Sequence, residues 1–341
     1  GCTSIGIALR INSLNGINTR LQMTYKTHLI SQKDTYLLLI SWAIIGALLP
    51  VAIAIGYVLV TYLLVLRTGN LYKIFISILC ILIFSDSRSS IFSFAETAKI
   101  SLIVLTLIYL VFNYNNMAVK RNDLFRFFLP FLVFSLMTTL WASQPFIAFQ
   151  KAISFGIIIF TVPLIYHNGR IDNRFFNREI VYFLFSILLV GFLIQFVSPS
   201  FTTLVGRYRG LLGNPNGLGI FLLVVFSVVY PILNRKEFHQ NDRLFVWLLY
   251  IMFIGSLVFS ASRSAIVAIG IFVILNRFRY FSNAAMLLIF IAFVFSYEVL
   301  LIQLPNVIMS FGLEEYFRLE TLEEGSGRFV AWNFAWEHIQ D

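Results

Sequence analysis

The chain has 341 residues, of which 59% are hydrophobic and only 12% are charged, and its mean hydropathy is +0.85. Soluble domains carry about 25% charged residues, so this composition excludes a soluble globular fold and indicates an integral membrane protein. The net charge of +9 does not indicate nucleic-acid binding, because the basic residues lie between apolar runs, where they report membrane topology.

Apolar runs follow one another along most of the chain, and a helix that crosses a bilayer needs about 20 such residues. The first run contains Gly46 and Pro50, which weaken helix continuity, so we predict two short helices that meet there; one tilted helix is the alternative. The predicted fold is all-α, a polytopic transmembrane bundle of about 10–11 spans. The runs are 36–66, 71–85, 98–113, 124–141, 146–166, 180–198, 217–233, 244–259, 263–275 and 284–304.

The segments between these runs differ in basic content. Of the 25 Lys and Arg residues, 17 lie in one set of segments and 7 in the alternating set. The positive-inside rule makes the richer set cytoplasmic. We therefore predict a basic cytoplasmic segment at 1–35, a transmembrane domain at 36–304 and the start of a large outer loop at 305–341. The richer set comprises 1–35, 67–73, 114–126, 167–179, 234–243 and 276–283.

Few polar side chains lie deep in the predicted spans. Lys151, Gln195 and Glu298 all lie near the outer ends of their helices. Each can reach the lipid headgroups on its own, but together they favour an outward-facing polar cavity. No comparable cluster is expected at the inner ends.

The outer segment 199–216 carries Arg207 and Arg209 just before an apolar run. Asn214 can cap the following helix, and Pro215 suits its first position. The N-terminus of that helix then points outward with free N–H groups and a partial positive charge.

A second outer segment repeats this arrangement. Ser262 is placed to cap a helix, and Arg263 follows it directly. Two such helix starts on one side favour a phosphate-bearing ligand. The alternative is that the caps are structural and the arginines meet ordinary lipid headgroups.

The C-terminal segment contains a third arginine. Phe329, Trp332 and Trp336 follow helical spacing, which predicts a short surface helix with one apolar face, and Arg328 lies on the same side. The alternative is an anchoring helix with a solvated arginine. The sequence shows no metal-binding cluster and no complete catalytic set, so no cofactor is expected. His338 is the one histidine in a predicted outer segment, and we take it as a bystander.

The outer segments resemble the O-antigen ligase and O-antigen polymerase family. That family carries an Arg-x-x-Gly stretch leading into an Asn-Pro-Asn helix start, here Arg207 to Gly210 and then Asn214 to Asn216. A Ser-Arg helix start follows, here Ser262-Arg263, and then a large outer loop that opens with Ser-Gly-Arg and a nearby Trp, here 326–328 and 332. Order, spacing and predicted side all agree. The resemblance covers roughly residues 36–341, and its motifs lie only in the second half of the chain.

The resemblance implies a metal-independent glycosyltransferase in the bacterial inner membrane, with its active face in the periplasm. Such enzymes move a glycan from undecaprenyl pyrophosphate to an acceptor sugar, either lipid A core or a lipid-linked repeat. Arg207, Arg209, Arg263 and Arg328 would bind the pyrophosphate, supported by Asn214, Asn216 and Lys151. The family's general-base His lies further along the outer loop, so we expect it beyond Asp341 and expect this chain alone to be inactive.

Two other readings stay open. A membrane transporter or flippase for a lipid-linked or anionic glycan would favour inverted repeats and polar groups at the membrane midplane, and neither is evident. A non-catalytic membrane scaffold is the other. Ligase and polymerase share these motifs, so the sequence does not separate them.

Overall fold

Helices dominate the chain in this computed structural model, which describes residues 25–87, 89–119, 122–173, 175–234 and 243–278, together with 288, 291, 310 and 336. The all-α prediction is confirmed for this part, apart from one very short hairpin. In chain order the elements are α2 (Tyr25–Ser31), α3 (Lys33–Leu48), α4 (Val51–Arg67), α5 (Leu71–Asp86), η1 (Ser90–Phe92), α6 (Ser93–Asn113), η2 (Tyr114–Asn116), α7 (Asp123–Thr138), η3 (Thr139–Trp141), α8 (Pro145–Asp172), α9 (Phe176–Val197), α10 (Pro199–Thr202), β1 (Thr203–Leu204), β2 (Arg207–Tyr208), α11 (Pro215–Asn234), α12 (Arg243–Ser260) and α13 (Arg263–Phe278).

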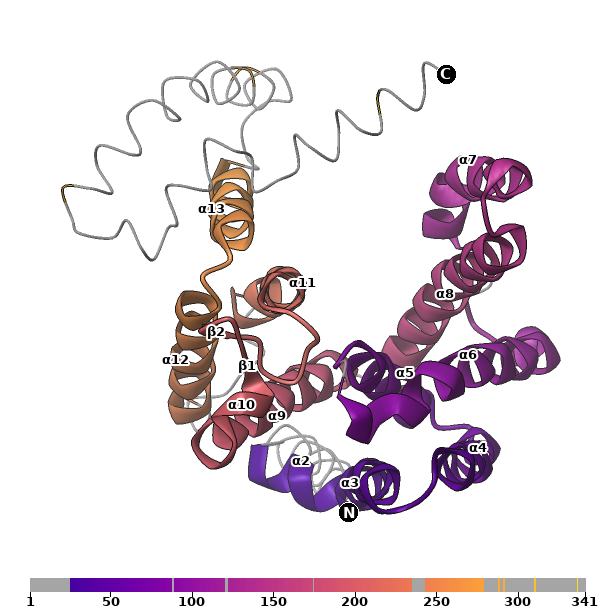
Figure 1. Cartoon of the computed structure of the whole chain (residues 1–341), viewed down its shortest axis with the longest axis horizontal. Coiled ribbons are helices and arrows are strands. Elements are labelled where there is room, and N and C mark those ends of the chain that lie inside the picture. The colour runs from indigo at the N-terminus through magenta and orange to yellow at the C-terminus, as the bar shows by residue number, and fades with distance from the viewer. Residues whose placement is uncertain are drawn as a thin grey trace, which may run out of the picture.

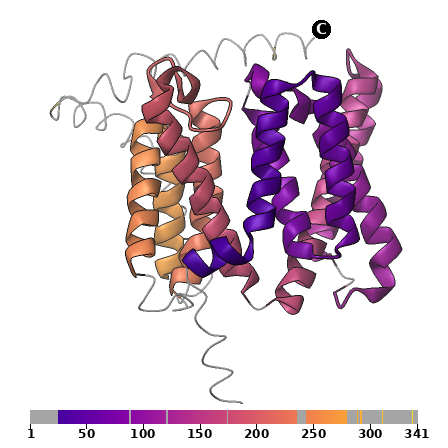
Figure 2. The same cartoon turned by 90° about the horizontal axis from the view of Figure 1, so that it is seen from below.

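The long apolar run 36–66 folds as two helices. α3 ends at Leu48 and α4 begins at Val51, with Pro50 between them in non-helical backbone. Proline lacks an amide donor and clashes with the preceding helical turn, so it ends α3. The two helices pack against each other and run in opposite directions in Figure 2. The predicted break near Gly46 and Pro50 is therefore present.

Four described helices are long and apolar enough to cross a membrane: Ser90–Asn116, Asp123–Trp141, Pro145–Ile171 and Phe176–Val197. Large apolar side chains remain exposed on them, including Phe112 at 82%, Phe127 at 78% and Phe146 at 79%. Soluble monomers rarely expose apolar side chains in such density, so these features indicate a helical membrane protein. The full number of spans stays a prediction, and most of the run 284–304 lies outside the described residues.

The helices pack in two neighbouring groups (Figure 1). In the first, α4, α5 and α6 pack together, and α7 pairs with α8, which also contacts α5 and α6. In the second, α11 packs against α12 and α13, and α12 also contacts α9. Contacts of α9 with α5 and α8 join the groups. Buried aromatic side chains such as Trp42, Phe94 and Phe183 fill the core.

The helix axes are roughly aligned, with the chain running up and down between two distinct ends (Figure 2). The connection from α9 to α11 lies at the upper end in that view, and α2 lies at the lower end. The basic-residue distribution predicts that the upper end is outside and the lower end cytoplasmic. All the described arginines of the resemblance, Arg207, Arg209 and Arg263, belong to the elements of the upper end.

Candidate functional site

A tight hairpin presents Arg207. Strands β1 and β2 pair antiparallel, with Thr203 opposite Tyr208 and Leu204 opposite Arg207. The two residues between them, Val205 and Gly206, both have positive φ, at 50° and 72°. Positive φ at both central positions defines a type I′ turn, whose twist matches the flanking strands. The hairpin thus sets Arg207 directly after the two-residue tip.

Arg207 connects three parts of the chain. Its Nε donates to the carbonyl oxygen of Ser260 at 2.9 Å, and its Nη2 donates to the carbonyl oxygen of Ala261 at 3.0 Å. The same Nη2 donates to Oδ1 of Asn216 at 3.1 Å. Ser260 ends α12, and Asn216 lies in the first turn of α11. The planar guanidinium therefore ties the start of α11 to the turn that precedes α13.

Arg209 holds its own loop together. Its Nε and Nη2 donate to the carbonyl oxygen of Phe201 at 3.1 and 2.9 Å, and its Nη1 donates to the carbonyl oxygen of Gly213 at 3.3 Å. The amide of Gly213 in turn donates to Oδ2 of Asp86, at 3.0 Å, and so fixes the loop to the end of α5. These bonds give Arg209 a structural role. Its predicted contact with pyrophosphate stays a prediction.

Asn214 caps α11 in the predicted way. Its Oδ1 accepts the amide of Gly217 at 2.6 Å, and Pro215 occupies the first helical position. This bond satisfies one of the amide groups that a helix start leaves unpaired. Asn216 is exposed in that first turn and accepts from Arg207, so both asparagines of the motif have defined partners.

The start of α13 differs from the predicted serine cap. The backbone carbonyl of Ser262 accepts the amides of Ala265 and Ile266, both at 3.1 Å, which makes Ser262 the residue before the helix. Its hydroxyl, however, is buried and makes no hydrogen bond. The side chain is turned toward α11, because a Cβ placed on Gly219 would come within 2.2 Å of Ser262 Oγ. The serine therefore serves helix packing rather than capping.

Backbone strain gathers beside Arg207. Among the described residues, Val205 and Ala261 are the non-glycine residues with positive φ, at 50° and 47°. This region is unfavourable for residues with a Cβ, and most of all for a β-branched one. Val205 lies in the Arg207 hairpin, and the Ala261 carbonyl accepts from Arg207. Strained residues of this kind gather at functional sites.

The structure does not gather every predicted site residue. Lys151 is exposed on α8, and Figure 1 shows α8 on the other side of the chain from α11, α12 and α13. Gln195, one of the polar residues expected to form an outward cavity, lies in the last turn of α9 and accepts from the hydroxyl of Thr202 on α10. Arg328 and Glu298 lie outside the described residues.

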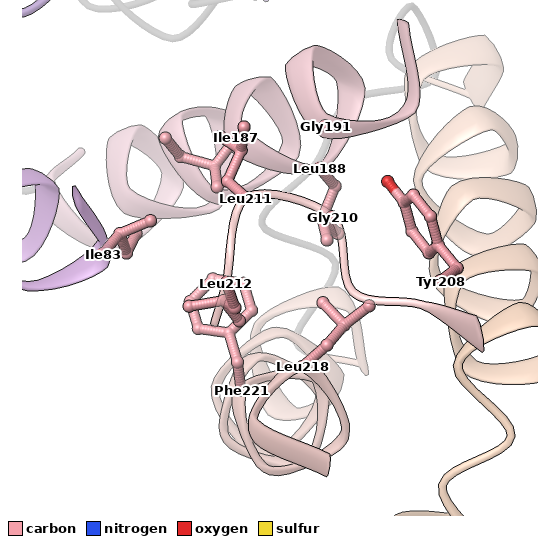
Figure 3. A pocket seen from close by; sticks show the side chains of 10 residues that line it. All are labelled: Ile83, Ile187, Leu188, Gly191, Tyr208, Gly210, Leu211, Leu212, Leu218 and Phe221. Carbon is pink, nitrogen blue, oxygen red and sulfur yellow. The ribbon is translucent and has the colours of Figure 1, made fainter. Parts of the chain in front are cut away.

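One cavity among the described residues of this end is small and apolar. Figure 3 shows it between α9, α11 and the loop that joins them, with Tyr208, Leu211 and Leu212 on the loop side. Its free volume is about 10 Å³, roughly the space of one water molecule. This cavity is therefore a small packing gap beneath the loop and is too small for a glycan. Burial raises the pKa of Tyr208 to about 12, which keeps this phenol protonated at neutral pH.

Sequence reasoning missed a buried polar cluster at the opposite end. His28, on α2, lies against Glu179, on α9, with Nδ1 and Oε1 separated by 3.9 Å. The expectation of no polar cluster at the inner ends is therefore wrong. Glu179 stands in the first turn of an apolar helix, where an acidic residue is ordinary, and no spacing pattern links it to a histidine so distant in sequence.

The described residues contain no group of three or more His, Cys, Asp or Glu side chains that could hold a metal ion. The arrangement at the upper end instead offers arginines, helix N-termini and a rigid, strained loop, which together suit an anionic ligand. No protein-family model, no curated protein and no solved structure matches the chain.

Proposed function

We propose that this protein transfers a glycan from undecaprenyl pyrophosphate to an acceptor sugar at the periplasmic face of the bacterial inner membrane, as an O-antigen ligase or polymerase does. The proposal rests on the resemblance of the outer segments and on the position of their residues at one end of a helical membrane protein. The acceptor would be lipid A core for a ligase, or a second lipid-linked repeat for a polymerase.

One observation carries the proposal: the bonds of Arg207 to Ser260, Ala261 and Asn216. They join two motifs that are more than fifty residues apart in the chain. As a result, the N-terminus of α11 and the segment leading into Arg263 lie side by side. Helix N-termini and arginines both favour anions, so their meeting supports a shared site for a pyrophosphate.

These bonds also divide the roles of the arginines. The Nε and Nη2 groups of Arg207 already donate to the protein, so we assign Arg207 as the residue that positions the two helix starts. Arg263, the first residue of α13, stands in the Ser-Arg helix start of the resemblance, and we assign it the contact with the pyrophosphate. Its charge would stabilise the leaving group as the glycosidic bond breaks, because preorganised positive charge favours a developing anion.

The test is a transfer assay in nanodiscs with a longer version of the protein that carries the outer-loop His implied by the resemblance, since the 341 residues alone are expected to be inactive. The donor is a fluorescent glycan on undecaprenyl pyrophosphate, and lipid A core or a second donor is the acceptor. We expect a larger labelled glycolipid and free undecaprenyl pyrophosphate in equal amounts. Arg263→Ala should reduce the rate by about 10²-fold, the scale for losing one donor to a developing anion. Arg67→Ala is the control, since Arg67 is an exposed arginine at the other end.

For Arg207 the transfer assay is combined with a measurement of Tm, because a positioning residue affects both. A lysine cannot reproduce a planar fork that serves three acceptors, so Arg207→Lys and Arg207→Ala should both lower the transfer rate and the Tm. A Tm and a transfer rate equal to those of the wild type in Arg207→Lys would contradict the positioning role. In sealed proteoliposomes, movement of the intact donor across the bilayer, with no product formed, would instead favour the flippase alternative.

A further inference from the structure

The inner end of the helices contains a buried polar cluster that glycan transfer does not use. His28 and Glu179 have side chains that are 0% and 2% exposed. His28 belongs to α2, which lies outside the candidate membrane spans. Residues from α3, α5 and the α8–α9 junction surround the pair, so the cluster joins elements that are far apart in the sequence.

Each polar atom of Glu179 has a defined neighbour. Its Oε1 accepts from Nε2 of Gln32 at 3.2 Å, and its Oε2 accepts from Nδ2 of Asn173 at 2.7 Å. On the other side, Nε2 of His28 lies 3.2 Å from the hydroxyl of Tyr36 and 3.5 Å from that of Tyr72. The two phenols and two amides are neutral, so they leave the charge of the carboxyl group uncompensated.

The atoms that face each other are Nδ1 of His28 and Oε1 of Glu179. They are 3.9 Å apart, and Nδ1 makes no hydrogen bond. This gap is too long for a hydrogen bond but closes with a shift of about 1 Å. A buried histidine nitrogen without a hydrogen bond calls for an explanation, and a carboxyl oxygen that faces it supplies one if the two groups titrate as a coupled pair.

Charge balance decides how many protons the pair holds. A buried carboxylate opposite a neutral imidazole has net charge −1, which is costly to bury. One proton makes the pair neutral, whether it resides on the carboxyl group or on the imidazole. Burial lowers the pKa of His28 to about 4, so a second proton is resisted at neutral pH.

Other ionisable groups near the pair that the structure describes are a neutral phenol, an arginine over an aromatic ring and exposed side chains. Tyr182 packs against the His28 ring with centroids 5.1 Å apart and stays neutral as a phenol. Arg178 precedes Glu179 on α9, and its guanidinium lies over the Phe175 ring, 5.7 Å from the centroid. Consecutive helical residues point about 100° apart, so Arg178 and Glu179 leave α9 in different directions. Lys33 and Asp34, on α3, are exposed.

We propose that His28 and Glu179 bind one proton between them and that this protonated pair holds α2 against the inner ends of α3, α5 and α9. When α2 is released, the histidine returns to its ordinary pKa of about 6.5 and the glutamate to about 4.3. Above pH of about 6.5 the released pair has therefore lost its proton while the docked pair keeps it. The docked state binds more protons there, so docking weakens as the pH rises.

A nitroxide on α2 tests this in the full chain. Ile30 is 62% exposed, so a label on Ile30→Cys, with Cys2 and Cys80 replaced by Ala, leaves the cluster untouched. We expect an immobile spectrum at pH 6 and a mobile component that grows as the pH is raised to 10. Glu179→Gln mimics the protonated carboxyl group, so its label should stay immobile throughout. Asp34→Asn, which removes an exposed carboxylate nearby, should keep the transition.

The wild-type profile alone can overturn the proposal, without relying on any variant. A label that is equally immobile from pH 6 to pH 10 would show that docking of α2 is not linked to a proton. A transition that persists unchanged in Glu179→Gln would assign the proton to another group. Neither outcome bears on glycan transfer, which is proposed for the opposite end.

Discussion

Asn214 and Ser262 occupy equivalent positions at two helix starts, but their side chains act differently. Asn214 Oδ1 accepts the amide of Gly217, whereas the Ser262 hydroxyl is buried without a hydrogen bond. A cap satisfies an otherwise unpaired amide, while a buried unpaired hydroxyl costs free energy. Two residues of similar capping propensity therefore contribute to stability with opposite signs.

Alanine at each position tests this difference. Asn214→Ala should lower the free energy of unfolding by about 1 kcal/mol, the usual value of an N-cap. Ser262→Ala should leave stability unchanged or raise it slightly, since it removes a buried group without a partner. Thermal unfolding in detergent measures both. A loss of stability in Ser262→Ala as large as in Asn214→Ala would show that the serine does cap α13.

For single residues, the sequence predicts hydrogen-bond partners that are near in the chain and misses those that are distant. The bond from Asn214 to Gly217 follows from spacing alone, because a cap and its amide are three residues apart. The partners of Arg207 at Ser260 and Ala261 depend on how α11 and α12 pack. The unbonded hydroxyl of Ser262 likewise depends on Gly219 of a neighbouring helix. Neither is encoded in a local pattern.

Among the elements, α11 and α13 approach each other closely because Gly219 has no side chain. A Cβ there would lie 2.2 Å from Ser262 Oγ, 2.5 Å from Ser262 Cβ and 3.0 Å from Ala265 Cβ. Small residues at such contacts let helix backbones pack closely in membranes. This contact keeps the start of α13 beside the start of α11, which is the geometry that the proposed site needs.

Gly219→Ala should therefore push the two helix starts apart. We expect a loss of stability of about 1–3 kcal/mol, the usual effect of overpacking, together with reduced glycan transfer. Ser262→Gly in the same chain removes the nearest atoms and should restore part of both. Gly270→Ala is the matched control, because nothing lies within 4 Å of a Cβ at that position of α13. Equal losses in the two single variants would contradict the close contact.

Helix positions were largely predictable from apolar runs, and their exact extents were not. The break at Pro50 appears as expected, since proline acts through the local backbone. α8 extends to Asp172, six residues past the predicted run 146–166. The apolar run marks only the apolar part of this helix, whose last residues are mostly polar. α2 was missed altogether, since its docking depends on tertiary contacts of His28 rather than on its own short sequence.

On the scale of the whole molecule, two polar centres lie at opposite ends of an apolar helical body. The upper end holds Arg207, Arg209 and the starts of α11 and α13, and the lower end holds the His28–Glu179 pair. Figure 2 shows the two ends separated by the length of the helices. The transfer proposal depends on which end faces outward, because transfer from a lipid-linked donor needs the arginine end in the periplasm.

Cysteine labelling in intact spheroplasts tests this orientation most directly. In a chain with Cys2 and Cys80 replaced by Ala, Ser200→Cys reports the upper end and Asn116→Cys the lower end, and both positions are exposed. The account predicts that an impermeant maleimide labels Ser200→Cys in intact spheroplasts and labels Asn116→Cys only after permeabilisation. Labelling of Asn116→Cys in intact spheroplasts, with Ser200→Cys protected, would contradict both the topology and the proposed function.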